Sequence, residues 1–294
     1  MSFSPERPCA RGRHPKLSAF LRKLMDNIPW SERAEVEESA RFDAPPSGRF
    51  RVRNANGHTR IVGEDREDIQ ITALKTARAE STAAATAMLD DIRLVFIETL
   101  EGATLEVQTP RKWHRRGCAN LCVRLPRAMH VAVFAENGRV DVEGIRGSVC
   151  AHSTNGSANV ADVVGDIEVE TTNAKVSCSS TCGRLSARSS NGKIQIEHHR
   201  GSVNASTSNG LIRAALDALD AGGVQLATSN GRIILDLPEE TDADVDIRVD
   251  NGTIQNERCL CEGARESDGR MTGRLGHGGA PIKLRTSNGS ISIH

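Results

Sequence analysis

The chain has 294 residues, and its 38 basic and 38 acidic side chains give zero net charge with neutral histidines. Nucleic-acid-binding proteins usually carry a basic excess, so this balance argues against a nucleic-acid partner. The six Phe and two Trp all lie at or before Phe134, and there is no Tyr. Because aromatic side chains fill most large cores, the core of residues 135–294 must be thin enough for aliphatic residues to fill it.

Targeting signals are not evident in the sequence. No apolar stretch reaches the roughly 18 residues of a transmembrane segment, and the start lacks the apolar core of a signal peptide. We therefore expect a cytoplasmic protein, with a membrane- or surface-associated location by a non-standard route as the alternative. Without a secretory signal, the eight cysteines are expected to be mostly reduced thiols.

Residues 1–45 read as a basic leader. After a start rich in Arg and Pro, an amphipathic helix is predicted, whose apolar stripe consists of Leu17, Phe20, Leu21, Leu24 and Met25. Residues 16–30 are typical of a helix that contacts a membrane surface or docks on a partner protein. The alternative is a helix that packs on its own domain.

Residues 46–294 are predicted to form one all-β repeat domain. Its lead-in, residues 46–134, has strand-like segments around Asn56-Gly57, then an Ala-rich helix within residues 77–92, then three further strand-like segments. The helix places Ala85, Met88 and Leu89 on one face. We expect it to cap an open end of the repeat, because stacked repeats need polar terminal units.

Residues 135–294 contain a turn that repeats with a nearly constant period. The first four intervals between its Asn residues are 18 residues long, and the next two are 21. The repeated residues are Asn137, Asn155, Asn173, Asn191, Asn209, Asn230, Asn251 and Asn288. A pair of Ser or Thr residues precedes most of them, as in Thr207-Ser208, and Gly usually follows. Gly supplies the positive φ that many turns need, and Asn tolerates it.

Apolar positions recur at fixed offsets from each Asn. Three residues after it stand aliphatic residues such as Val140, Val176 and Ile194, and five after it stand residues such as Val142 and Ile196. A spacing of two places both positions on one face of a strand. Each repeat thus carries two short strands and two turns.

Two architectures fit this pattern. Asn-Gly between alternating segments is a strong hairpin signal, so an antiparallel meander is one of them. The other, which we favour, is a single-stranded β-solenoid with coils of about 18 residues. Only in a solenoid does each Asn lie above another Asn, so that their amides bond along the stack as a structural ladder.

Several residues have side chains that occur in metal or catalytic sites, but their arrangement in the sequence does not indicate such a site. Five residues could act as zinc ligands, but their spacing is not that of common zinc sites. They are His114, Cys118 and Cys122, with Cys178 and Cys182. Cys178 is instead expected to point inward as a small apolar residue. The pair His198-His199 and the isolated His152 are expected to be solvated. The sequence therefore indicates no catalytic residue, metal or cofactor.

The array resembles the bacterial β-strand-repeat family of putative adhesins, a domain family of largely unassigned function. The resemblance covers about residues 46–294 and rests on FRVRNANGHTRIVG, the Ala-rich helix, LCVRLPRAMHVAVFAENGRVDVEGI, the TSNG turns and the ending GGAPIKLRTSNGSISIH. It implies a β-solenoid without established catalytic residues.

These features predict a non-enzymatic, adhesin-like protein that presents a repetitive surface to an unidentified protein or envelope polymer. One alternative is a structural scaffold that assembles end to end into a homo-oligomer. Another is a carbohydrate-active enzyme, since parallel β-helices can house such enzymes. The absence of aromatic platforms in residues 135–294 argues against the enzyme.

Overall fold

The computed structural model describes residues 32–110, 116–267 and 269–294, without the side chains of residues 261–267. The predicted amphipathic helix of residues 16–30 and His114 lie outside the described residues. Helix α2 spans Thr82–Asp90, and the other regular elements within these described residues are strands, which confirms the all-β prediction. Within the described residues, no helix combines the length and apolar character required to cross a bilayer.

The strands form one continuous 21-stranded sheet. Their bounds are β1 Glu32–Asp43, β2 Arg49–Asn56, β3 Thr59–Glu64, β4 Asp68–Ala79, β5 Arg93–Thr99, β6 Gly102–Gln108, β7 Gly117–Pro126, β8 His130–Asn137, β9 Val140–Glu143, β10 Val149–Ser153, β11 Ala158–Val164, β12 Ile167–Thr171, β13 Val176–Ser189, β14 Ile194–Asn209, β15 Ile212–Ala218, β16 Val224–Asn230, β17 Ile233–Asp236, β18 Ala243–Asn256, β19 Cys261–Ser267, β20 Arg270–Leu275 and β21 Ala280–Ile293.

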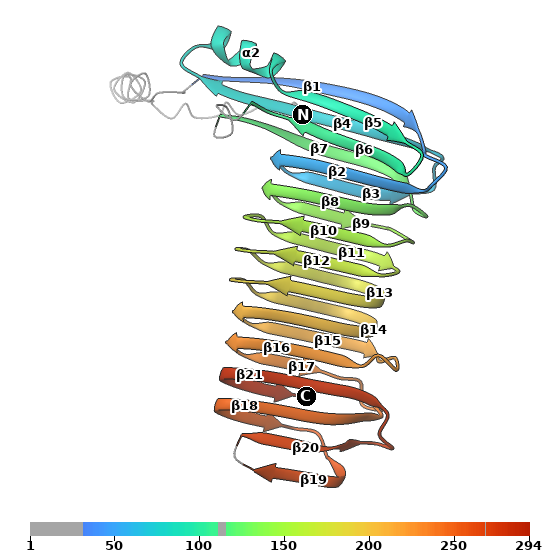
Figure 1. The fold of residues 1–294 in the computed structure, drawn as a ribbon, viewed down its shortest axis with the longest axis vertical. Coiled ribbons are helices and arrows are strands. Elements are labelled where there is room, and N and C mark those ends of the chain that lie inside the picture. The colour runs from blue at the N-terminus through green and yellow to red at the C-terminus, as the bar shows by residue number, and fades with distance from the viewer. Residues whose placement is uncertain (1–31, 111–115, 268) are drawn as a thin grey trace, which may run out of the picture.

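The strands stack into a tall column with two walls, because the chain alternates from one wall to the other (Figure 1). Wall A contains β5, β6, β2, β8, β10, β12 and β16, in that spatial order, with the second halves of β13 and β14 between β12 and β16. Wall B contains β1, β4, β7, β3, β9, β11, β15 and β17, with the first halves of β13 and β14 between β11 and β15.

Neighbouring strands in the central part of each wall run parallel, and their paired residues are 18 apart in sequence. Val149 pairs with Ile167, Ile167 with Leu185, and Leu185 with Val203. On wall B, Val140 pairs with Ala158 and Ala158 with Val176 in the same way. This parallel pairing is incompatible with an antiparallel meander through the array. Antiparallel pairs occur only near the two ends of the stack within the described residues.

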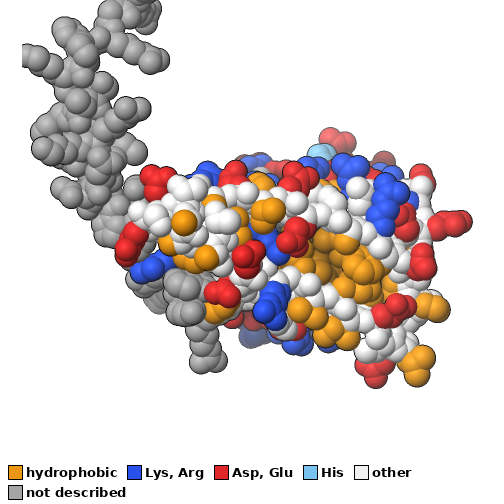
Figure 2. Space-filling model, turned by 90° about the horizontal axis from the view of Figure 1, so that it is seen from above, with side chains coloured by type: hydrophobic (Ala, Val, Ile, Leu, Met, Phe, Trp, Pro, Cys, Tyr) orange, Lys and Arg blue, Asp and Glu red, His pale blue; other side chains and the backbone are white. Residues whose placement is uncertain are grey.

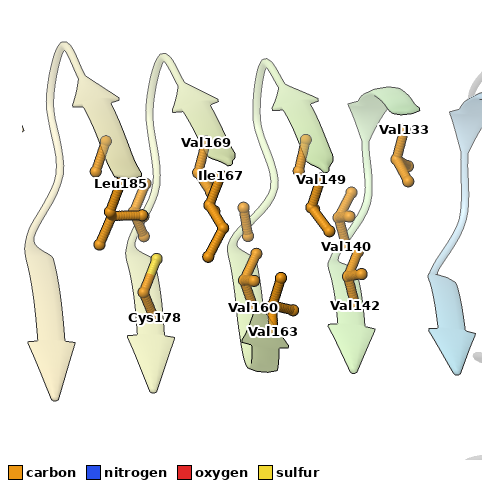
Figure 3. Packing of buried hydrophobic residues seen from close by; sticks show 14 of the residues in the cluster. Val133, Val140, Val142, Val149, Val160, Val163, Ile167, Val169, Cys178 and Leu185 are labelled. Atoms are coloured by element: carbon orange, nitrogen blue, oxygen red, sulfur yellow. The ribbon is translucent and has the colours of Figure 1, made fainter. Parts of the chain in front are cut away.

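The core is a set of aliphatic columns between the walls (Figure 3). Val140, Val142 and Val160 point inward from wall B toward Val149, Ile167 and Val169 of wall A, and all are at most 2% exposed. Cys178 takes its place in the wall B column with no exposed surface, as predicted. Burial raises the pKa of its thiol to about 12, so it packs as a neutral apolar group. In residues 135–294, columns of Val, Ile, Leu and Ala thus fill the gap between the walls without aromatic residues, whereas Phe50 is buried in the core of the lead-in.

The repeated turns are held by the first hydroxyl of each Ser/Thr pair, which points inward. Thr171 Oγ1 donates to the carbonyl oxygen of Gly156 at 3.2 Å, and Thr207 Oγ1 donates to that of Gly192 at 3.3 Å. Ser153, Ser189, Thr228 and Thr286 make the equivalent bond to the turn before them. The hydroxyl two residues before six of the eight Asn residues therefore ties one turn to the next, while Ala135 and Val249 occupy this position before Asn137 and Asn251.

Glycine follows the Asn for two reasons. Gly57, Gly252 and Gly289 have positive φ, as predicted from the sequence, whereas Gly138, Gly156, Gly192, Gly210 and Gly231 do not. The constraint on these five is close approach, since a Cβ on Gly192 would lie 2.0 Å from the carbonyl oxygen of Ala174 in the preceding turn. Glycines of the opposite turns, such as Gly183 and Gly201, also have positive φ.

The N-terminal end of the stack differs from the predicted leader boundary at residue 45. Residues 32–43 form β1, which pairs antiparallel with β4 along its whole length from Glu32 to Asp43. The β1 sequence lacks the apolar alternation that identifies a strand, because its side chains are mostly exposed and need not be apolar. Its backbone supplies the pairing instead. Helix α2 lies at this end against β1 and β4 and buries Ala85, Met88 and Leu89 (Figure 1).

The C-terminal end does not follow the order of the sequence. Strand β21 lies between β17 and β18, since Ile233 pairs with Ile291 and Ile291 pairs with Ile254. The closing segment SISI is therefore an internal strand of the stack. Strands β20 and β19 follow β18 as an antiparallel pair at the end of wall A.

The turn geometry makes a prediction for Gly192. Its replacement by Val should lower the free energy of unfolding by about 1–3 kcal/mol, because the added Cβ meets the Ala174 carbonyl and the turns must move apart. Urea unfolding followed by circular dichroism measures this change. Ala174→Gly is the matched control at the same turn position and should cost less than about 1 kcal/mol. An unchanged midpoint for Gly192→Val would contradict the close approach.

Candidate functional site

The eight predicted Asn residues lie together in one continuous ladder along the turns. Each amide donates to the side-chain oxygen of a neighbour, as from Asn155 Nδ2 to Asn137 Oδ1 and from Asn173 Nδ2 to Asn155 Oδ1, both at 2.9 Å. The bonds continue through Asn191, Asn209 and Asn230 at 2.9–3.2 Å. Each amide inside the row uses one N–H group and one lone pair of its oxygen on the ladder, so the row links successive turns of the stack.

The ladder departs from the sequence in two ways. Asn56 precedes it, since Asn137 Nδ2 donates to Asn56 Oδ1 at 3.0 Å. Asn288 lies between Asn230 and Asn251, with bonds of 2.9 and 3.1 Å. Asn56 was visible in the sequence as an earlier Asn-Gly pair, but its 81-residue separation from Asn137 hid their contact.

The outer face of wall A holds the residues best placed to meet a ligand. A surface hollow of about 410 Å³ lies over β2, β6, β8 and β10, and its lining includes Arg49, Arg51, Thr104, His130 and Cys150. These side chains share one face because they stand at alternate positions on strands whose other positions fill the core. His130 Nδ1 accepts a hydrogen bond from the Ser148 backbone N–H at 3.1 Å, which places the ring proton on Nε2.

Arginines make one border of this hollow basic. Arg49, Arg51 and Arg53 alternate along the exposed face of β2, and none makes an ion pair with another described residue. The Arg51 guanidinium lies 5.9 Å from the centre of the Phe134 ring. Phe134 is 37% exposed and stacks on His152, with ring centres 5.4 Å apart. Arg49 and Arg51 thus line the hollow together with Glu101, Arg53 follows them on β2, and the accessible ring of Phe134 lies next to Arg51.

Next to Phe134, four functional side chains stand on two neighbouring strands. Cys150 pairs with Glu168, and His152 pairs with Glu170, between β10 and β12. Ligand atoms of Cys150, His152 and Glu168 all lie within 4.8 Å of one another, and His152 Nδ1 lies 3.2 Å from Glu170 Oε2. Partial burial and the nearby Glu168 carboxylate raise the pKa of the Cys150 thiol.

These four residues could not be joined from the sequence pattern as first interpreted. His152 was expected to have no catalytic role, and Cys150 was counted only among the thiols. The signal that could have found them is the same 18-residue offset that defines the core. When it is applied to outward positions, it places Glu168 beside Cys150 and Glu170 beside His152.

The other cysteines weighed for zinc are not brought together. Cys178 is buried, Cys182 is exposed, and Cys118 and Cys122 lie on β7. Among the described residues, none of these four belongs to a cluster of metal-ligating side chains. His114, the remaining member of that set, lies outside the described residues.

His199 contradicts the expectation that both members of the His198-His199 pair are solvated. His198 is exposed, but His199 has no exposed surface and lies in a column between Thr181 and Leu216. Its Nδ1 lies 2.9 Å from Thr181 Oγ1, and its Nε2 lies 3.3 Å from the Ser202 carbonyl oxygen. Burial lowers the pKa of His199, so the folded protein holds it neutral.

A second polar cluster, on wall B, is fully committed to internal bonds. Asp141 accepts hydrogen bonds from Asn159 and Arg139, both at 2.7 Å, and pairs with His58 at 2.5 Å. Partial burial alone would raise the pKa of Asp141, but these three bonds outweigh it and hold the pKa below its usual range. The carboxylate thus joins neighbouring coils and has little capacity left for a ligand.

The family model described as Toastrack DUF4097 matches residues 51–294. The chain belongs to this family. Its resemblance to a β-strand-repeat family of putative adhesins, recognised from the turns and the closing segment, is confirmed. No curated protein matches the chain.

The solved structures to which the chain is similar include three bacterial proteins. A putative adhesin from Bacteroides fragilis is 10% identical with a TM-score of 0.45, and the match covers 88% of this chain and 97% of that one. A putative cell adhesion protein from Clostridium sporogenes is 9% identical with a TM-score of 0.28, covering 88% and 99%. A putative lipid binding protein from Parabacteroides distasonis is 8% identical with a TM-score of 0.29, covering 88% and 96%.

The ladder predicts a stability effect for Asn173. Its replacement by Ala removes the bonds to both Asn155 and Asn191, so the free energy of unfolding should fall by about 1–2 kcal/mol. Chemical denaturation measures the difference. Asn204→Ala, on the exposed face of β14, is the control and should change stability by less than about 0.5 kcal/mol. Equal effects of the two variants would mean that the ladder adds nothing to stability.

His199 predicts how stability changes with pH. Its pKa is lower in the folded chain than its ordinary value of 6.5, so the unfolded chain binds more protons between the two values. Stability should therefore fall as the pH drops through about 6.5 toward 5. Thermal unfolding at several pH values tests this. His199→Gln should flatten the dependence in that window, whereas the exposed control His198→Gln should retain it.

Proposed function

We propose that this protein is a non-enzymatic, adhesin-like β-solenoid that contacts a cell-envelope polymer or protein through the outer face of wall A. Its coils are about 18 residues long, as the 18-residue offset between paired strands supports. Helix α2 serves as the cap of the N-terminal end, which its contacts with β1 and β4 support. The partner contact uses the rigid sheet rather than mobile loops.

This proposal rests on one observation: the arginines of β2 lie beside the hollow of wall A. Three exposed cations without carboxylate partners lie along one strand, beside a concave surface and an accessible aromatic ring. Such a surface favours anionic groups, because none of the three arginines makes an ion pair with a described carboxylate, while Glu101 in the hollow and Glu106 beside Arg53 offset part of their charge. Envelope polymers that bear phosphate or carboxylate groups supply such anionic groups.

Binding to defined polymers tests the proposal. Immobilised lipopolysaccharide and teichoic acid serve as anionic polymers, and dextran serves as the neutral one. The wild-type chain should bind an anionic polymer and release it as salt is raised. Replacing Arg49, Arg51 and Arg53 together by Gln should weaken binding about tenfold or more. The control replaces Arg184 and Arg188, on β13 of the same wall, and should bind like the wild type.

Two outcomes would overturn the proposal. Equal binding of the β2 variant and the β13 control would remove the arginine stripe as the contact. Turnover of a polysaccharide by the purified chain, lost on replacement of one Asp or His, would show that it is an enzyme.

End-to-end assembly is a second candidate, supported by the N-terminal end of the stack. An apolar hollow of about 300 Å³ there is lined by residues that include Ala40, Phe42, Leu94 and Phe96. Figure 2, viewed along the stack, shows apolar side chains gathered on this end among charged ones. Phe42 and Phe96 stack with ring centres 3.7 Å apart. Filaments that grow with protein concentration and disappear in Phe96→Asp would favour this candidate, and a monomer at all concentrations would exclude it.

A further inference from the structure

The outer face of wall A contains a square of four side chains with metal-binding chemistry. Cys150 and His152 alternate along β10, while Glu168 and Glu170 occupy the paired positions on β12. Neighbouring strands lie about 4.8 Å apart, and alternate residues on one strand lie about 6.6 Å apart, so all four project from one small patch. A thiolate, an imidazole and carboxylates are the ligands that zinc prefers in proteins.

The distances within this square suit a single ion. Ligand atoms of Cys150, His152 and Glu168 lie within 4.8 Å of one another. Tetrahedral zinc holds its ligand atoms about 3.3–3.8 Å apart, given bonds of about 2.0–2.3 Å. The three atoms therefore need to approach by about 1 Å, which side-chain rotation provides without a change in the strands.

Two neighbours fix the imidazole. Phe134 stacks on the His152 ring with an angle of 4° between the planes, and Glu170 lies 3.2 Å from Nδ1. A carboxylate that accepts the proton of one ring nitrogen leaves the lone pair of the other free for a metal, and such carboxylate–histidine pairs commonly support zinc ligands. Within the described residues, the Cys150 thiol and the Glu168 carboxylate have no hydrogen bond or ion pair that would compete with an ion.

From these observations we propose that Cys150, His152 and Glu168 bind one zinc ion, with Glu170 as the positioning residue for His152. Three protein ligands leave a fourth position that faces outward beside the hollow. Water or a donor atom from a bound partner fills it. The proposal does not depend on the polymer contact, because it rests on the β10–β12 square alone.

Zinc titration of the full chain tests this site. The protein is stripped with a chelator and titrated against a chromophoric zinc indicator, and cobalt absorption is recorded in parallel. The wild type should bind one equivalent of zinc and show a thiolate-to-cobalt charge-transfer band. Cys150→Ser should abolish both signals. Glu170→Gln should keep the stoichiometry but weaken affinity by about 10–100-fold.

Matched cysteine variants make the result specific. Cys122→Ser and Cys182→Ser remove thiols elsewhere on the molecule and should bind zinc as the wild type does. Circular dichroism at the titration temperature establishes that every variant is folded. Absence of a tight zinc equivalent in the wild type would overturn the proposal. So would retention of zinc and of the cobalt band in folded Cys150→Ser, or their loss in Cys122→Ser.

Discussion

Close contact between consecutive turns is the constraint on which the structure depends. At Gly192 the turns are so close that a Cβ would overlap the carbonyl of the turn before it, and the inward hydroxyl of Thr207 bonds to the Gly192 carbonyl. Both features set the same separation between strands. Once that separation is fixed, each Asn amide reaches the one below it, and the aliphatic columns of neighbouring coils touch. The TSNG signature thus encodes a distance as well as a turn.

The same register determines what the surface can do. Because paired strands differ by a constant offset, outward side chains form columns just as inward ones do. The cations of β2, the aromatic ring of Phe134 and the Cys150–His152 pair therefore occupy fixed positions on a rigid wall. Functional groups that are far apart in sequence, such as those of β2 and β8, become neighbours without any loop that must order on binding.

Inward residues could be predicted from the sequence far better than outward ones. The columns of Val140 and Val142 were recognised because apolar identity repeats at each coil, and Cys178 was assigned to the core on that ground. His199 was missed because a polar residue gives no sign of burial until Thr181 is placed beside it. Strand β1 and the position of β21 depend on backbone pairing between distant segments, which leaves little trace in side-chain pattern.

The position of β21 has a consequence for how the chain assembles. Strand β18 pairs only with β20 and β21 among the described strands, so strand pairing joins it to β16 and β17 only through β21. Strands β16 and β17 find parallel partners that precede them in the chain, whereas the parallel partner of β18 follows it. Folding that proceeds in chain order should therefore pause at β18, because its parallel neighbour must first be added from a later segment.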